Sequence, residues 1–414
     1  MAGNHALKDV KDFLRSLDFT KDVPFTLEGG VLFSTTDEDD VTHTIQLTRA
    51  NSILYRKSVD VLFTEAGGSS LVSRRGAEKW LQQAIVRVSG KPKKWQEFPN
   101  DVRISKAISE LDRLVNIEPS QYEIQVPVRG LHPFGLPYKI GDVEFNILSE
   151  DHLRKFKNIE PLERVIEDIK VVAVVETKAK DSSAAQTNAK QSVRKIIEII
   201  NFFSDLIPYS PSWIYLPGDF ESAITANILT KLESLEITPT MNCERVGPFG
   251  GLNLKLLLEN DESRKFGFKQ VCTYLSSTPS KLQQLLLAGV RWAGRATVEL
   301  RPDIKFLLFA IALETVVLLG NKQDELLYRL RIRTAHLLGE GIEERLSMIG
   351  DLKDLYNKRS KIVHNGRTDI TDEDVYQIWW YSKRTIIRLL TDDNLSGMQT
   401  IQELGKWYDK KVLE

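Results

Sequence analysis

The sequence predicts an α+β region over residues 1–275, large enough for two subdomains, followed by an all-α helical bundle over residues 280–414. Two observations lead to this fold class. Helix-like and strand-like periodicities alternate up to about residue 275, whereas only helical periodicity follows. The segment SSTPS at 276–280 lies between the two patterns and marks the predicted boundary. A chain of 414 residues is long enough for two or three domains.

Elements of the N-terminal region follow from the spacing of apolar residues. Amphipathic faces predict helices over 7–17, 76–90 and 101–116. Alternating or β-branched runs, separated by Gly and Pro, predict the strands of a small sheet over 121–128, 138–148 and 168–178. A further helix, capped by Ser182 or Ser183, is expected to lie on this sheet and to run to about Phe203.

The C-terminal bundle is predicted as a succession of helices. Pro302 suits the first position of one helix, and Thr371 with Asp374 forms a capping box that opens another. In chain order the expected helices cover 282–296, 302–319, 322–338, 342–349, 351–364, 371–390 and 398–412.

Composition limits the function classes. Lys and Arg number 56 against 57 Asp and Glu, so a nucleic-acid site has to be a local basic patch. Two cysteines, Cys243 and Cys272, cannot form a disulfide framework or a four-thiolate zinc site, and they suit a reducing compartment. No histidine lies at ligand spacing from another or from a cysteine. We therefore expect no metal and no cofactor.

Membrane insertion and export are not expected either. The most apolar stretch, 304–319, is shorter than a membrane span and is interrupted by Lys305 and Glu314. Residues 1–13 lack the apolar segment of a signal peptide. The sequence thus predicts a cytoplasmic protein. It also lacks the phosphate-loop, dinucleotide-binding, H-E-x-x-H, C-x-x-C and G-x-S-x-G motifs, which disfavours the enzyme classes that use them.

The one local basic patch that stands out is LYNKRSKIVHNGR at 355–367, which contains no acidic residue. An arginine such as Arg359 can bind phosphate oxygens through two parallel hydrogen bonds and stabilise charge in a transition state. A histidine such as His364 can transfer protons near neutral pH. RNA supplies its own nucleophile in the 2′-hydroxyl, so this pair is sufficient for RNA cleavage, and DNA should resist it.

A purely structural interpretation of His364 stands beside the catalytic one. Asn365 and Gly366 can end a helix, and a histidine in the last turn then interacts with free carbonyls and the helix dipole. Helical geometry also separates Arg359 and His364 by about 140° around the axis. If the pair is catalytic, we expect a two-fold dimer to bring two copies of it to one phosphate.

The hexapeptide RSKIVH at 359–364 resembles the R-x4-H signature of HEPN ribonuclease domains, and LYNKRSKIVHNG resembles the Apea-like branch. The resemblance covers about residues 280–390. It implies a metal-independent, dimeric endoribonuclease that cleaves structured RNA such as tRNA, often as a toxin or abortive-infection effector in antiviral defence. The alternative is a non-catalytic HEPN-fold module that binds a nucleotide or a partner protein without cutting RNA. Arg359 would bind the scissile phosphate, His364 would act as acid or base, and Ser360 would orient one of them. The further basic residues of the motif, expected to bind RNA, are Lys358, Lys361 and Arg367.

Glu314 is the odd carboxylate in an apolar helix. It could hold Arg359 in a supporting role, but the sequence favours a structural ion pair with a basic residue of the next helix, one of Arg329, Arg331 and Arg333.

A different site is suggested by Glu176-x-Lys178 at the end of a predicted strand, which resembles half of the magnesium site of restriction-endonuclease-like folds. Asp168 and Asp142 are candidates for the missing second carboxylate. A solvated Glu-Lys pair is the commoner meaning of this spacing.

Overall fold

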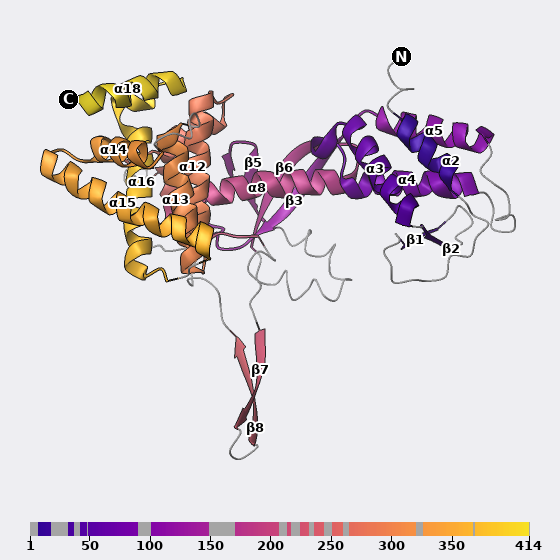
Figure 1. Ribbon diagram of the computed structural model, residues 1–414, viewed down its shortest axis with the longest axis horizontal. Helices are drawn as coiled ribbons and strands as arrows, with labels where there is room; N and C mark the ends of the chain where they lie inside the picture. The colour runs from indigo at the N-terminus through magenta and orange to yellow at the C-terminus, as the bar shows by residue number, and fades with distance from the viewer. Residues whose placement is uncertain are drawn as a thin grey trace. The chain divides into compact units, whose positions relative to one another are not determined.

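The computed structural model (Figure 1) describes residues 7–17, 32–36, 42–47, 49–89, 101–148, 170–206, 213–216, 224–231, 236–243, 251–259, 265–319, 326–366 and 369–413. The chain forms two compact units. The first unit comprises Met1–Ile124 and Glu176–Lys190, and the second comprises Gln125–Val175 and Gln191–Glu414. An α+β half followed by helices alone confirms the coarse order of elements that the sequence predicts.

Helices dominate the first unit. Its core is formed by apolar faces of α2 (Lys8–Ser16), α3 (Arg49–Glu65), α4 (Arg74–Ser89) and α5 (Asp101–Val115), as the spacing predicts for three of them. The first unit also contains the 3-10 turn η1 (Gly68–Ser70) and the antiparallel hairpin of β1 (Leu32–Thr36) and β2 (Thr42–Gln46). The cap of the next helix, α8, is Asp181 rather than Ser182 or Ser183, because its Oδ1 accepts the backbone N–H groups of Ser183 and Ala184, each at 2.9 Å.

A four-stranded sheet has the order β3 (Ser120–Val128), β6 (Val171–Ala179), β5 (Val143–Ile147), β4 (Tyr138–Ile140). The expected single strand over 138–148 is therefore two strands. Gly141, with a φ of 61°, lies in the tight turn between them, where a left-handed backbone favours glycine. α8 (Ser182–Ser204) follows β6, as the sequence predicts. The hairpin β7 (Ile224–Lys231) and β8 (Glu236–Cys243) comes next in the chain, followed by α9 (Leu254–Glu259) and α11 (Phe268–Leu275).

The C-terminal part of the second unit is the predicted helical bundle. It contains α12 (Lys281–Val298), α13 (Pro302–Leu318), α14 (Leu326–Leu338), α15 (Ile342–Asn365), α16 (Asp372–Thr391), α17 (Asp393–Ser396) and α18 (Ile401–Leu413). Pro302 begins α13, and the Thr371–Asp374 capping box opens α16, so both predicted signals are confirmed.

The two short helices expected over 342–349 and 351–364 form one helix, α15. Gly350 does not interrupt it, although glycine in a helix costs about 1 kcal/mol relative to alanine. The neighbouring side chains of Met348, Leu352 and Leu355 are buried in the bundle, and this packing outweighs the local preference.

The compact units do not coincide with the predicted boundary at 276–280, because Gln125–Val175 and the C-terminal half of α8 belong to the second unit together with the bundle. Arg291 Nε of α12 pairs with Glu198 Oε2 at 2.7 Å. The fully buried Lys383 of α16 donates from Nζ to Phe202 O at 2.8 Å and to Asp205 Oδ2 at 2.7 Å. Its burial lowers the pKa of the Lys383 ammonium group, and the charge of Asp205 opposes that shift. These contacts join α8 to the bundle, although the sequence periodicity changes only near residue 276 and places α8 before the predicted boundary.

Two helical glycines of the second unit give a matched stability test. A Cβ added at Gly294 would lie 1.7 Å from Glu198 O, whereas one added at Gly350 would meet nothing within 4 Å. We therefore expect Gly294→Ala to lower the free energy of unfolding by about 3 kcal/mol and Gly350→Ala to raise it by about 0.5–1 kcal/mol. Urea unfolding followed by tryptophan fluorescence checks both values. Equal stability of the two variants would contradict the close approach of α8 and α12.

Candidate active site

The basic segment predicted as the site forms the last turns of α15. The helix is continuous through Asn365 and ends at Gly366, whose φ is 62° and whose N–H donates to Ile362 O at 3.1 Å. Arg359 is half-buried and its side chain is 25% exposed, whereas His364 lies on the exposed surface. Because the helix is regular over both residues, their side chains leave it about 140° apart, as expected. Within one chain, therefore, Arg359 and His364 do not face the same point.

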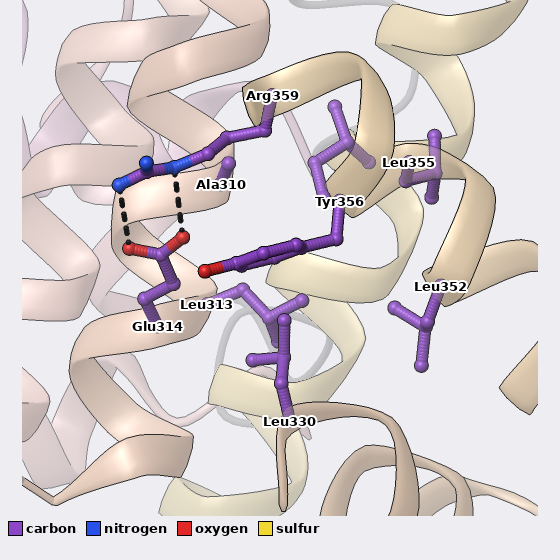
Figure 2. A pocket seen from close by; sticks show the side chains of 9 residues that line it. Ala310, Leu313, Glu314, Leu330, Leu352, Leu355, Tyr356 and Arg359 are labelled. Atoms are coloured by element: carbon purple, nitrogen blue, oxygen red, sulfur yellow. Dashed lines mark hydrogen bonds and ion pairs between the residues drawn. The ribbon is translucent and has the colours of Figure 1, made fainter. Parts of the chain in front are cut away.

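The Arg359 guanidinium pairs with the Glu314 carboxylate of α13 (Figure 2). Nη2 donates to Oε2 at 3.2 Å, and Nε lies 3.1 Å from Oε1. The second contact is an ion pair without hydrogen-bond geometry, since both buried atoms lack a hydrogen-bond partner. The sequence favours an arginine of α14 as the partner of Glu314, but the structure pairs Glu314 with Arg359 of α15. Arg333, for example, donates instead to Val317 O at 3.0 Å.

Apolar side chains surround this ion pair on its inner side (Figure 2). The Tyr356 ring lies under the guanidinium, with its centroid 5.8 Å from Cζ of Arg359. In the adjoining cavity, the centre of a water molecule can occupy a volume of about 10 Å³. The cavity therefore has room for one water and not for a phosphate group. Its remaining lining residues are Ala310, Leu313, Leu330, Leu352, Leu355 and Ile378. A phosphate can therefore reach Arg359 only from outside the bundle.

Burial also acts on the charge of Glu314. Desolvation raises the pKa of the Glu314 carboxyl above its ordinary value, and the positive charge and hydrogen bond of Arg359 oppose this shift without cancelling it. The carboxylate is thus costly to keep ionised inside the bundle, even with its arginine partner.

The other residues predicted to support catalysis or bind RNA lie in different surroundings. Lys358 is paired with the buried Asp374 of the α16 capping box, which compensates its charge locally. Ser360 is half-buried and Lys361 is exposed. Arg367 lies outside the described residues. Lys361 is therefore the predicted RNA-binding cation that the structure places on the open surface without an acidic partner among the described residues.

The alternative site in the N-terminal half is less organised. Glu176 and Lys178 are both exposed on β6, and Gln121 Nε2 donates to Glu176 Oε2 at 3.3 Å. Asp142 lies in the turn before β5, and Asp168 falls outside the described residues. Over the part of the chain that the structure describes, no group of three or more His, Cys, Asp or Glu side chains is placed to hold a metal ion.

Comparison with known proteins adds no further assignment. No family model matches the chain, and no curated protein or solved structure shows significant similarity to it. Among the helices that the structure describes, none is long and apolar enough to cross a membrane.

Proposed function

We propose that this protein is an endoribonuclease of the HEPN type, acting in the cytoplasm, in which Arg359 and His364 cleave structured RNA without a metal cofactor. The observation that carries the proposal is the state of Arg359. Glu314 holds one edge of its guanidinium, and among the described residues Nη1 forms no hydrogen bond or ion pair. An arginine fixed in this way is suited to bind a phosphate, and the exposed histidine of the same helix is suited to transfer a proton.

The proposed reaction is an intramolecular transesterification. The 2′-oxygen of the RNA forms a bond to phosphorus, the bond from phosphorus to the 5′-oxygen breaks, and a 2′,3′-cyclic phosphate and a 5′-hydroxyl result. One proton leaves the 2′-hydroxyl and one is added to the 5′-oxygen. His364 performs one of these transfers and water performs the other, and Arg359 stabilises the negative charge that grows on the phosphate oxygens.

A homodimer is part of the proposal. Since Arg359 and His364 leave α15 about 140° apart, one chain does not direct both at the same phosphate. Two copies of α15 related by a two-fold axis would place the arginine of one chain near the histidine of the other. The N-terminal α+β region would then select the RNA, tRNA included, or sense a trigger, as in a toxin or antiviral effector.

Cleavage in the absence of divalent cations tests the proposed function. We expect purified protein to cut total tRNA in EDTA, to leave 2′,3′-cyclic phosphate ends, and to spare a matched DNA. A single 2′-deoxy substitution at the cleaved nucleotide should abolish cutting there, because the nucleophile is then missing. Gel analysis of the products and of their ends gives the result.

Two outcomes would support a different function. Activity that needs Mg²⁺ and persists in His364→Ala would move the site to Glu176 and Lys178. RNA binding without cleavage, unchanged in His364→Ala, would instead indicate a non-catalytic HEPN module in which His364 interacts with the end of its helix.

A further inference from the structure

An ionised carboxylate in an apolar bundle requires an explanation. Glu314 is 19% exposed, and the α13 residues next to it in the helix, Leu313, Val316 and Val317, are buried. Burying an ion pair costs several kcal/mol per ion, and well-packed apolar residues in its place are often as stable or more stable. Packing alone thus gives no reason for Glu314 at this position.

The geometry of the pair shows what Glu314 does to Arg359. A guanidinium has two edges that can bind an oxyanion through two donors: the side edge formed by Nε and Nη2, and the end edge formed by Nη1 and Nη2. Glu314 contacts Nε and Nη2, which is the side edge. Figure 2 shows these two contacts and a third nitrogen that takes part in neither. The end edge therefore keeps its donors for another anion.

Tyr356 and the apolar wall restrict the same guanidinium from the inner side. The ring lies one helical turn before Arg359 on α15, with its centroid 5.8 Å from Cζ. The cavity beside it is too small for a phosphate. Contacts from α13 and from α15 thus fix both the position of the guanidinium and the edge that it presents outward.

We propose that Glu314 is the positioning residue of Arg359: it occupies the Nε–Nη2 edge so that the Nη1–Nη2 edge meets the scissile phosphate of RNA. This inference rests on the proposed ribonuclease function. The Glu314 carboxylate orients the guanidinium of Arg359, but it also partly neutralises the positive charge of that guanidinium. The attraction between Arg359 and the incoming RNA is therefore weaker. Glu314 should therefore raise kcat while weakening binding of the substrate.

The test is to measure kcat and KM separately, because removing the charge of Glu314 should lower kcat without raising KM. Glu314→Gln keeps the size of the side chain and an oxygen acceptor but removes the charge, and Glu343→Gln, at an exposed position of α15, makes the same change in net charge away from the pair. We expect Glu314→Gln to lower kcat about 10-fold with KM unchanged or lower, and Glu343→Gln to change neither. In an Arg359→Lys background, which lacks the two-edged fork, Glu314→Gln should cause no further loss.

A purely structural role would give a different pattern. The loss would then follow the fall in melting temperature, and it would appear equally in the Arg359→Lys background. Full activity of Glu314→Gln, or a higher kcat, would also overturn the proposal.

A second measurement keeps this inference separate from the ribonuclease function. In ¹⁵N-arginine-labelled protein, the Nε–H signal of Arg359 is identified by its absence in Arg359→Lys. We expect that signal to shift in Glu314→Gln, because the charge that lies 3.1 Å from Nε is removed, and to shift when a 2′-deoxy analogue of the RNA binds to the wild type. Absence of cleavage by the wild type would overturn the function alone. An Nε–H signal insensitive to Glu314→Gln would overturn the positioning role, whether or not RNA is cut.

Discussion

His364→Ala is expected to lower the rate of RNA cleavage by at least about 100-fold, the typical contribution of a positioned acid or base. Stability should not change, because the side chain is exposed and forms no hydrogen bond with the residues that the structure describes. The structural interpretation of His364 predicts the reverse: a modest loss of stability from the end of α15 and no specific loss of activity. Cleavage rates at saturating RNA, together with melting temperatures, separate the two.

The matched control for this variant is Val363→Ala, one residue earlier in α15. Val363 is 51% exposed, so its truncation tests a neighbouring surface position without removing a titratable group. We expect it to keep the wild-type rate. A similar loss in both variants would assign the effect to the helix end and not to the imidazole.

Arg359→Lys should cost about 100-fold in rate as well, although it keeps a positive charge beside Glu314. The ammonium group of lysine can still form an ion pair, but it lacks the planar fork that binds a phosphate through two parallel hydrogen bonds. The variant should therefore fold like the wild type, and its loss should appear in kcat. Arg295→Lys, at an exposed position of α12, is the matched control, and we expect it to keep full activity.

Arg359→Ala should additionally lose stability in a pH-dependent way. At pH 7 we expect a loss of about 2 kcal/mol, because the charge of Glu314 is left without its partner inside the bundle. Burial already raises the pKa of Glu314, and Arg359 opposes that rise, so removing Arg359 raises this pKa further. A folded-state pKa above the unfolded value means that the folded state binds the proton more tightly, so the free energy of unfolding falls as pH rises between the two values. The difference from wild type should therefore be largest above the folded-state pKa and shrink as Glu314 becomes protonated in acid.

Urea unfolding of Arg359→Ala and wild type between pH 4 and pH 7 measures this difference. In the double variant Glu314→Gln with Arg359→Ala, the pH-dependent part of the loss should disappear, because the titrating group is gone. A destabilisation of Arg359→Ala that is the same at every pH would contradict the proposed ion pair with Glu314.

Local sequence signals determined much of the fold. Pro302 begins α13 because its fixed φ and missing N–H suit the first helical position. Thr371 and Asp374 open α16 because their side chains satisfy backbone N–H groups within the same turn. Arg359 and His364 could be recognised as a candidate pair for the same reason, since residue type and helical spacing are local properties.

Tertiary packing decided what local signals could not. The burial of Met348, Leu352 and Leu355 keeps α15 continuous through Gly350. The contacts of Glu198, Phe202 and Asp205 place half of α8 in the same compact unit as the bundle, although the periodicity changes near residue 276. These contacts join residues far apart in the chain, and no local pattern encodes such distances.

The partner of Glu314 shows the same limit at the candidate site. The sequence pattern favours an arginine of α14, because α14 is the helix that follows α13 in the chain. Helix packing brings Arg359 of α15 to Glu314 instead, 45 residues away. The sequence by itself determined which groups can perform the chemistry. Only the tertiary structure decided which edge of the arginine is held and which is left open, because that depends on how α13 and α15 pack together.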